Sequence, residues 1–192
     1  MPEDKMWLVT GLGNPGLQYA KNWHNCGYRT LDLLAERHKL AVDRIRFHAL
    51  SGIGMIGGCK CLLIKPTTYM NLSGESIREA SAYYHIEPDH CLVIYDDVDI
   101  RFGQIRIREN GGPGTHNGMR SVVHSLDSEL FPRVRIGIGP QPELWDIADY
   151  VLSNLPESAW DDHVKALNEA ADAVEMILQK GIAVAMNHYN RR

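Results

Sequence analysis

The sequence has no hydrophobic run long enough to span a membrane. Its first residues, Met-Pro-Glu-Asp-Lys, lack the pattern of a signal peptide. We therefore expect a cytoplasmic protein with no membrane contact. Internal repeats, low-complexity tracts and linker-like segments are also missing, and the chain has 192 residues. This predicts one domain spanning residues 1–192.

Cysteine is scarce, and its spacing gives no indication of a zinc site. The four cysteines include the pair Cys59-x-Cys61, but no second cysteine or histidine pair stands at zinc spacing. Alternation places Cys59 and Cys61 on one face of an apolar strand, where buried free thiols are expected. The sequence also lacks Gly-x-Ser-x-Gly, the turn that carries the serine nucleophile of many hydrolases.

The net charge is −4, which argues weakly against a nucleic-acid partner, but the charge is unevenly distributed. Residues 101–135 contain six arginines, no lysine and three acidic residues, a local net charge of +3 that leaves −7 on the remainder. An arginine-only positive segment in an acidic protein indicates an anion site, with scattered surface arginines as the alternative. The six are Arg101, Arg106, Arg108, Arg120, Arg133 and Arg135.

Apolar and alternating runs predict strands at residues 6–10, 47–56, 60–65, 91–95, 104–108 and 134–139. Gly57-Gly58 forms a two-residue hairpin turn between the second and third of these. The run at 91–95 is continuously apolar, as in a central strand buried on both faces.

Helical patterns alternate with these strands. They cover residues 25–38, a segment capped by Ser73 or Ser76, a short segment entered from the loop at 110–118, and a long segment. The long helix has Pro156 at its first position and ends at Gly181. Its apolar positions repeat near 3.6 residues, and they are Trp160, Val164, Leu167, Ala171, Val174 and Leu178. We expect Asn25 to cap the first helix, and Ser153 or Asn154 to cap the last. The alternation predicts a single-domain three-layer α/β sandwich with a twisted mixed sheet flanked by helices.

His24 and Asp96 are the candidate catalytic pair. A lone loop histidine is most often a surface residue, but Asp96 follows the buried run at 91–95, where an unpaired carboxylate is costly. A carboxylate beside an imidazole fixes its tautomer and stabilises its protonated form. Because the sequence shows no serine elbow and no reactive-looking cysteine to act as a nucleophile, the pair is expected to activate a water molecule. Asp97 should point to the opposite face, because neighbouring strand residues alternate.

Three asparagines, Asn14, Asn71 and Asn117, each lie in a glycine-bounded loop. Asparagine is common in turns because it tolerates left-handed backbone geometry. The alternative is that the three side chains supply amide donors and acceptors to a carbonyl substrate. Asn14, Asn71 and Asp96 come just after predicted strands, where open α/β sheets form their ligand crevice.

Residues 11–16 also fit G-x-G-x-x-G, the fingerprint of dinucleotide-binding proteins. That motif needs a helix to begin at the last glycine, so that its amides hold a pyrophosphate. Here Pro15 occupies the turn, and the first helical pattern begins with Tyr28. We keep nucleotide binding as a weak alternative.

Taken together, the motifs resemble those of bacterial-type peptidyl-tRNA hydrolase, in the same order over nearly the whole chain. Each motif is weak alone, whereas the set is highly specific. The matching pieces are residues 11–16 with Tyr19, His24-Asn25, residues 66–74, residues 95–99, residues 114–118 and residues 133–139.

The resemblance implies cleavage of the ester joining a peptide to the 3′ end of tRNA, with no metal or other cofactor, by a monomer. It implies that His24 accepts the proton of water, that Asp96 supports it, and that Asn14 distinguishes blocked from free aminoacyl-tRNA. Substrate contacts are implied for Tyr19, Tyr69, Asn71 and Asn117, and tRNA phosphate contacts for Arg106, Arg108 and Arg135.

Two positions depart from the commoner family pattern. Trp23 stands where an arginine often precedes the histidine, so the local anchor that such an arginine would provide is not expected here. Thr115 stands where a glycine often precedes His116, which puts loop flexibility in doubt. An RNA-binding module without turnover is the competing class, although all the catalytic groups are kept. An aminopeptidase-like or nucleotide-dependent enzyme is disfavoured by the lack of a metal cluster and by the late first helix.

Overall fold

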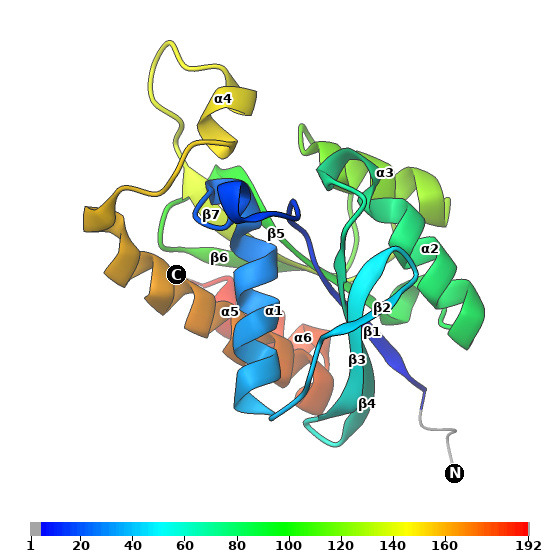
Figure 1. The fold of residues 1–192 in the computed structure, drawn as a ribbon. Coiled ribbons are helices and arrows are strands. Elements are labelled where there is room, and N and C mark those ends of the chain that lie inside the picture. The colour runs from blue at the N-terminus through cyan, green and yellow to red at the C-terminus, as the bar shows by residue number, and fades with distance from the viewer. Residues whose placement is uncertain (1–4, 192) are drawn as a thin grey trace.

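The computed structural model describes residues 5–191 and consists of one seven-stranded mixed sheet with helices on both faces (Figure 1). The strand order is β2-β3-β4-β1-β5-β7-β6. Strands β4, β1, β5 and β7 run parallel, whereas β2, β3 and β6 pair antiparallel with their neighbours. The strands are β1 Trp7–Gly11, β2 Arg44–Arg46, β3 Ala49–Ile56, β4 Cys59–Pro66, β5 Cys91–Arg101, β6 Ile105–Arg108 and β7 Arg133–Gly139.

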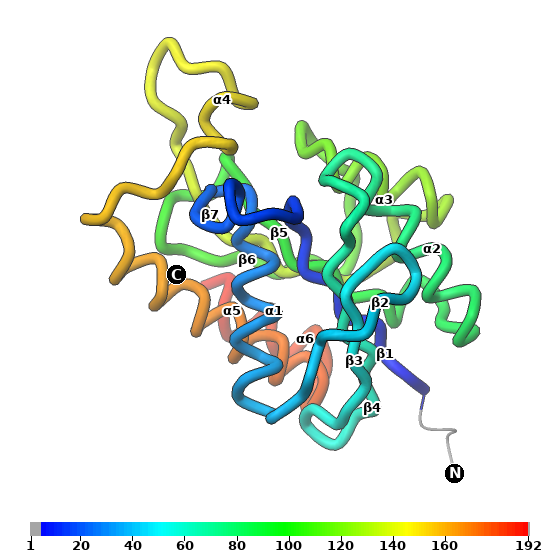
Figure 2. Tube along the Cα trace, in the orientation of Figure 1, coloured from blue at the N-terminus to red at the C-terminus, as the bar shows by residue number. Residues whose placement is uncertain are grey.

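Two apolar cores lie on the two faces of the sheet and confirm the predicted three-layer sandwich. Helices α2 (Ser73–Tyr84) and α3 (Asn117–Leu126) cover one face, and α1 (Cys26–Arg37), α5 (Trp160–Lys180) and α6 (Ile182–Tyr189) cover the other (Figure 2). The short helix α4 (Ile147–Val151) stands apart at one end of the sheet (Figure 1). Within residues 5–191, no helix combines the length and apolarity needed to cross a bilayer. Residues 1–4, which belong to the predicted non-signal N-terminus, lie outside the described residues.

Two glycines of the G-x-G-x-x-G segment, Gly11 and Gly13, serve helix packing. A Cβ atom on Gly11 would come within 2.2 Å of the Gly27 carbonyl oxygen in α1, and one on Gly13 within 2.5 Å of the Tyr28 ring. These glycines therefore let α1 lie directly against the end of β1. The first α-helix begins at Cys26, ten residues after Gly16, so the segment does not form a phosphate-binding helix start.

Several strand predictions need correction. Phe47 and His48 are not in a strand, because both have positive φ angles and form the turn between β2 and β3. Strand β2 was missed because it is only three residues long and fully exposed, without an alternating pattern. Asp96 does not follow its strand, since β5 continues to Arg101.

The predicted side-chain caps are not formed, although the helices themselves are present and Asn25 occupies the N-cap position of α1. Ser73 Oγ donates to the Met70 carbonyl and Ser76 Oγ to the His48 carbonyl, so neither caps α2. Asn25 precedes α1, but its side chain binds elsewhere. Ser76 and Asn25 are used in contacts with distant segments, and Ser73 in a local bond to the carbonyl three residues before it, so none of the three side chains is left to cap a helix.

The C-terminal region also differs in detail. The 3-10 turn Glu157–Ala159 precedes α5, which begins at Trp160, so Pro156 precedes the helix and neither Ser153 nor Asn154 caps it. The predicted apolar positions all lie in α5. The buried face of this helix includes His163, however, and Val164, which was predicted to be on that face, is 46% exposed. Gly181 ends α5 as predicted, and α6 follows directly.

Candidate active site

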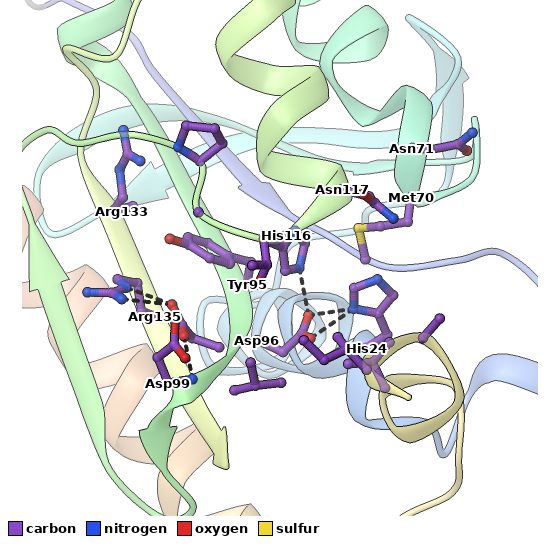
Figure 3. Close-up of a pocket in the computed structure, with 18 of the residues that line it drawn as sticks. His24, Met70, Asn71, Tyr95, Asp96, Asp99, His116, Asn117, Arg133 and Arg135 are labelled. Carbon is purple, nitrogen blue, oxygen red and sulfur yellow. Dashed lines mark hydrogen bonds and ion pairs between the residues drawn. The ribbon is translucent and has the colours of Figure 1, made fainter. Parts of the chain in front are cut away.

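The candidate site is a cavity of about 580 Å³ beyond the carboxyl ends of β1 and β4, against β5 and α3 (Figure 3). Ligands of open α/β sheets usually bind at this edge. Of the predicted site residues, Tyr19, Tyr69 and Arg106 lie outside its lining. Those in the lining are Asn14, His24, Asn71, Asp96, Arg108, Asn117 and Arg135.

Asp96 and His24 meet at this cavity, although 72 residues separate them. His24 lies in the 3-10 turn Trp23–Asn25 before α1, and Asp96 lies on the central strand β5. His24 Nδ1 is 2.9 Å from Asp96 Oδ1 and 2.8 Å from Oδ2. The predicted contact between the two side chains is therefore present.

The Asp96 carboxylate is only 1% exposed. Burial by itself would raise the pKa of Asp96, but the charges of His24 and His116 and their hydrogen bonds outweigh burial and hold the pKa well below its usual range. Asp96 is therefore an anion at neutral pH. An anion at this position orients any ring that donates to it.

Sequence reasoning missed His116, the second imidazole on the same carboxylate. Its Nε2 lies 3.0 Å from Asp96 Oδ1, and its ring centroid lies 4.8 Å from that of His24 (Figure 3). Its Nδ1 accepts a hydrogen bond from the Met119 backbone N–H and so caps α3. In the neutral ring this leaves the proton on Nε2, directed at Asp96. Its place in a glycine-rich loop beside Asn117 was the available signal.

Asn14 is held from three directions. The Asn25 side chain accepts from the Asn14 backbone N–H at 2.9 Å and donates to the Asn14 carbonyl at 3.0 Å. The Met70 backbone N–H donates to Asn14 Oδ1 at 2.7 Å. Because Oδ1 is occupied, the amide presents Nδ2 as its donor end. Asn25, expected to be a helix cap, instead fixes the loop that carries Asn14.

Asn71 and Asn117 are both exposed at the cavity, on the short turn before α2 and on the first turn of α3 (Figure 3). Tyr19 and Tyr69 lie beside each other outside the cavity, with ring centroids 6.4 Å apart in an edge-to-face arrangement. The asparagines therefore face the site, and the two tyrosines form a neighbouring surface.

The predicted arginines lie in unlike environments. Arg106 and Arg135 are directly paired across β6 and β7, as are Arg108 and Arg133, so all four share one face. Arg108 is exposed in the cavity lining, whereas Arg106 Nη1 donates to the Ile105 carbonyl. Arg135 donates to Asp97 Oδ2 at 2.9 Å, which confirms that Asp97 points away from His24.

Arg133 was not among the predicted site residues, and it is 1% exposed. Its guanidinium donates to the Gly112 carbonyl at 3.2 Å and the Glu129 carbonyl at 3.0 Å, and lies 4.1 Å from the Phe131 ring centroid. It thus anchors the loop before α3. In this loop the positive φ angles fall on Gly111 and Gly114, so Thr115 does not need a glycine's backbone freedom.

One group of potential metal ligands occurs within residues 5–191, namely His24, Asp96 and His116, with donor atoms within 4.8 Å of one another. The hydrogen bonds among these three side chains already use His24 Nδ1, His116 Nε2 and the Asp96 carboxylate. A metal ion would have to displace the protons that join them.

Helix α4 supplies one wall of the cavity, although the sequence patterns predicted no helix at this position. Ile147, Ala148, Val151 and Leu152 line the cavity and give it an apolar side. The segment is tied to the turn that carries His24. Asn22 Nδ2 donates to the Leu152 carbonyl at 2.6 Å, and the Trp23 N–H donates to the Ser153 carbonyl.

The fold and the site define an α/β enzyme with a carboxylate-bound histidine near the carboxyl ends of the parallel strands of a mixed sheet. Residues 8–192 match the model of the family described as "Peptidyl-tRNA hydrolase". The chain belongs to the peptidyl-tRNA hydrolase family, as the motifs predicted, and is a hydrolase of that family.

Relatives support this assignment over nearly the full length. Peptidyl-tRNA hydrolase of Alkaliphilus oremlandii is 46% identical over 185 residues, which cover 96% of this chain and 100% of the relative. That of Chloroflexus aurantiacus is 49% identical over 189 residues, covering 96% and 99%. The crystal structure of peptidyl-tRNA hydrolase from Acinetobacter baumannii superposes with a TM-score of 0.91 at 34% identity, covering 100% of this chain and 97% of the other.

Proposed function

We propose that this protein hydrolyses the ester bond between a peptide, or an N-blocked aminoacyl group, and the 3′ end of tRNA. The observation that carries the proposal is the buried Asp96 carboxylate bound to His24 Nδ1 in a cavity lined by asparagine amides. Membership of the family supports the choice of substrate. The products are free tRNA and a peptide with a free carboxylate.

His24 is the general base of this reaction. With its Nδ1 proton donated to Asp96, the neutral ring keeps a lone pair on Nε2. Nε2 takes a proton from water as the water oxygen bonds to the ester carbonyl carbon. The bond to the ribose oxygen then breaks, and the imidazolium returns the proton to that oxygen. The Asp96 anion stabilises the imidazolium, and such catalysis is worth about 10² to 10⁴ in rate.

The asparagines hold the acyl side of the substrate. Asn14 is fixed by Asn25 and Met70 so that its Nδ2 can donate to a peptide carbonyl. A free aminoacyl ester lacks that carbonyl, so this hydrogen bond favours blocked substrates. Asn71 and Asn117 line the same cavity and supply further amide groups for the acyl chain or the terminal ribose.

The tRNA is anchored by the arginines of β6, with Tyr19 and Tyr69 next to the reacting end. Arg106 and Arg108 project from one face of β6, and Arg108 reaches the cavity lining. Arg135 neutralises Asp97, so its contribution is to offset an acidic side chain that also lines the cavity. A phosphate at this edge would then meet Arg108 without facing an unpaired Asp97.

The direct test is release of N-blocked aminoacyl groups from tRNA with a chelator present. We expect activity in wild type, and a loss of about 10² to 10⁴ in kcat with near-normal tRNA affinity in His24→Ala. His124→Ala, an exposed histidine on α3, is the matched control and should behave as wild type. Substantial turnover by His24→Ala would refute the general-base role. An RNA-binding module without turnover would bind tRNA and release nothing.

A further inference from the structure

The turn that carries His24 is held by Arg29, a residue outside the cavity lining. Arg29 lies in the first turns of α1. Its Nη1 donates to the Ala20 carbonyl at 2.7 Å, and its Nη2 donates to the Asn22 carbonyl at 2.8 Å. These two carbonyls belong to the irregular segment that leads directly into the 3-10 turn with His24. One guanidinium therefore fixes the approach to the catalytic histidine.

The third contact of Arg29 reaches across to α5. Its Nε donates to His163 Nε2 at 3.1 Å, and its guanidinium carbon lies 5.6 Å from the Trp160 ring centroid. His163 is fully buried, and burial first and the Arg29 charge second lower its pKa to about 3. At neutral pH His163 is therefore the uncharged acceptor of this hydrogen bond. The orientation of the guanidinium is fixed at both ends.

Trp23 completes the arrangement without supplying a charge. Its ring packs on Phe102 at 5.3 Å and Tyr150 at 5.6 Å between centroids, and it meets His163 edge-on at 6.4 Å. Trp23 thus fills the space beneath the turn, while Arg29 binds the carbonyl groups of Ala20 and Asn22 in the segment before it. The fork of a guanidinium can bind two carbonyls and a ring nitrogen at once, which a lysine ammonium on a flexible stem does not reproduce.

We propose that Arg29 is a positioning residue for His24. The backbone at Ala20 and Asn22 sets where the imidazole stands relative to Asp96, and Arg29 sets that backbone. This inference rests on the general-base role proposed for His24. It assigns to Arg29 no contact with substrate, so its loss should appear in the chemical step and not in tRNA binding.

Arg29→Gln tests this, with Arg37→Gln as the matched control. Arg37 also joins α1 to α5, donating to Asp172 at 2.7 Å and Asn168 at 2.7 Å, but it is at the far end of α1. We expect Arg29→Gln to lower kcat about 10- to 100-fold, as small misplacements of a catalytic group do, with KM for peptidyl-tRNA within about twofold. Arg37→Gln should leave both constants near wild type.

A spectroscopic readout separates positioning from general stability. The low-field proton NMR signal of the His24 Nδ1–H group, bound to Asp96, should broaden or vanish in Arg29→Gln and persist in Arg37→Gln. If Arg29→Gln does not fold, Arg29→Lys decides by the same criteria, because it keeps the charge and loses the fork. Wild-type kcat in the folded Arg29 variant, or an equal loss in Arg37→Gln, overturns the proposal. Turnover by His24→Ala overturns the general-base role instead, so the two failures are distinguishable.

Discussion

His116 Nε2 lies 3.0 Å from Asp96 Oδ1, so the buried carboxylate that binds the candidate general base also binds a second imidazole. The two histidines come from opposite faces of the sheet, His24 from the turn before α1 and His116 from the start of α3 (Figure 3). Asp96 therefore joins the two helical layers at the site. The low pKa of Asp96 depends on both histidines, so the role of His116 can be tested by substitution in the same way as that of His24.

Replacing His116 by asparagine should separate its two roles. Asparagine is a good N-cap and can still accept from the Met119 N–H, but it does not reach Asp96 as Nε2 does. We expect His116→Asn to fold normally and to lose about tenfold in kcat, the value of one hydrogen bond to a charged group of ~1.4 kcal/mol or more. Steady-state kinetics and thermal melting check this. A wild-type kcat in His116→Asn would mean that His116 serves only as the cap of α3. In that case His116→Ala should lower the stability of the protein and leave kcat unchanged.

Asn14→Asp should blur the preference for N-blocked substrates. The aspartate keeps an oxygen for the Met70 N–H, which donates to Asn14 Oδ1 at 2.7 Å, but it removes the Nδ2 donor. The ratio of kcat/KM for blocked over unblocked aminoacyl-tRNA should fall about tenfold or more, the net value of one hydrogen bond. Asn14→Ala should show the same direction without an added charge. An unchanged ratio in both variants would remove Asn14 from substrate discrimination.

The arginines of β6 should act on the tRNA body more than on the reacting ester. Arg106→Ala with Arg108→Ala should raise KM for full-length tRNA and flatten its salt dependence, each lost phosphate contact removing about 0.7 to 0.9 from the slope. A minimal substrate with only the terminal nucleotides should be spared by Arg106→Ala, because Arg106 lies outside the cavity lining. Assays of both substrates across a salt series give the comparison. Equal losses on both substrates would contradict anchoring.

His163 should make the protein less stable in acid. Its pKa is lowered from 6.5 to about 3 in the folded protein, with burial as the main cause. Between about pH 6.5 and about pH 3 the unfolded chain binds a proton that the folded chain does not, so the free energy of unfolding falls as pH falls. The contribution is at most about 1.4 kcal/mol per pH unit. Urea unfolding at several pH values should show a shallower acid decline in His163→Asn than in wild type; equal declines would mean that other groups dominate.

The sequence alone predicted the class of fold and the family, and it gave a set of candidate site residues. The periodicity of apolar residues distinguished strands from helices, and the polar groups that follow buried runs stood out because burial makes them costly. Asn14 and Asp96 were identified in this way, His24 was identified as the imidazole that Asp96 could support, and all three line one cavity. The orientation of Asp97 followed from strand alternation and is confirmed by its bond to Arg135.

The tertiary structure decided which groups are partners. His116 reaches Asp96 across 20 residues, and Arg29 reaches His163 across 134, distances that local periodicity does not encode. Asn25 resembled a helix cap in sequence, but it binds the backbone of Asn14 once β1 and α1 are packed together. The physical reason is that a sequence pattern reports the local direction and burial of each side chain. The pairing of side chains depends on strand order and helix packing, which bring distant segments of this chain to the same edge of the sheet.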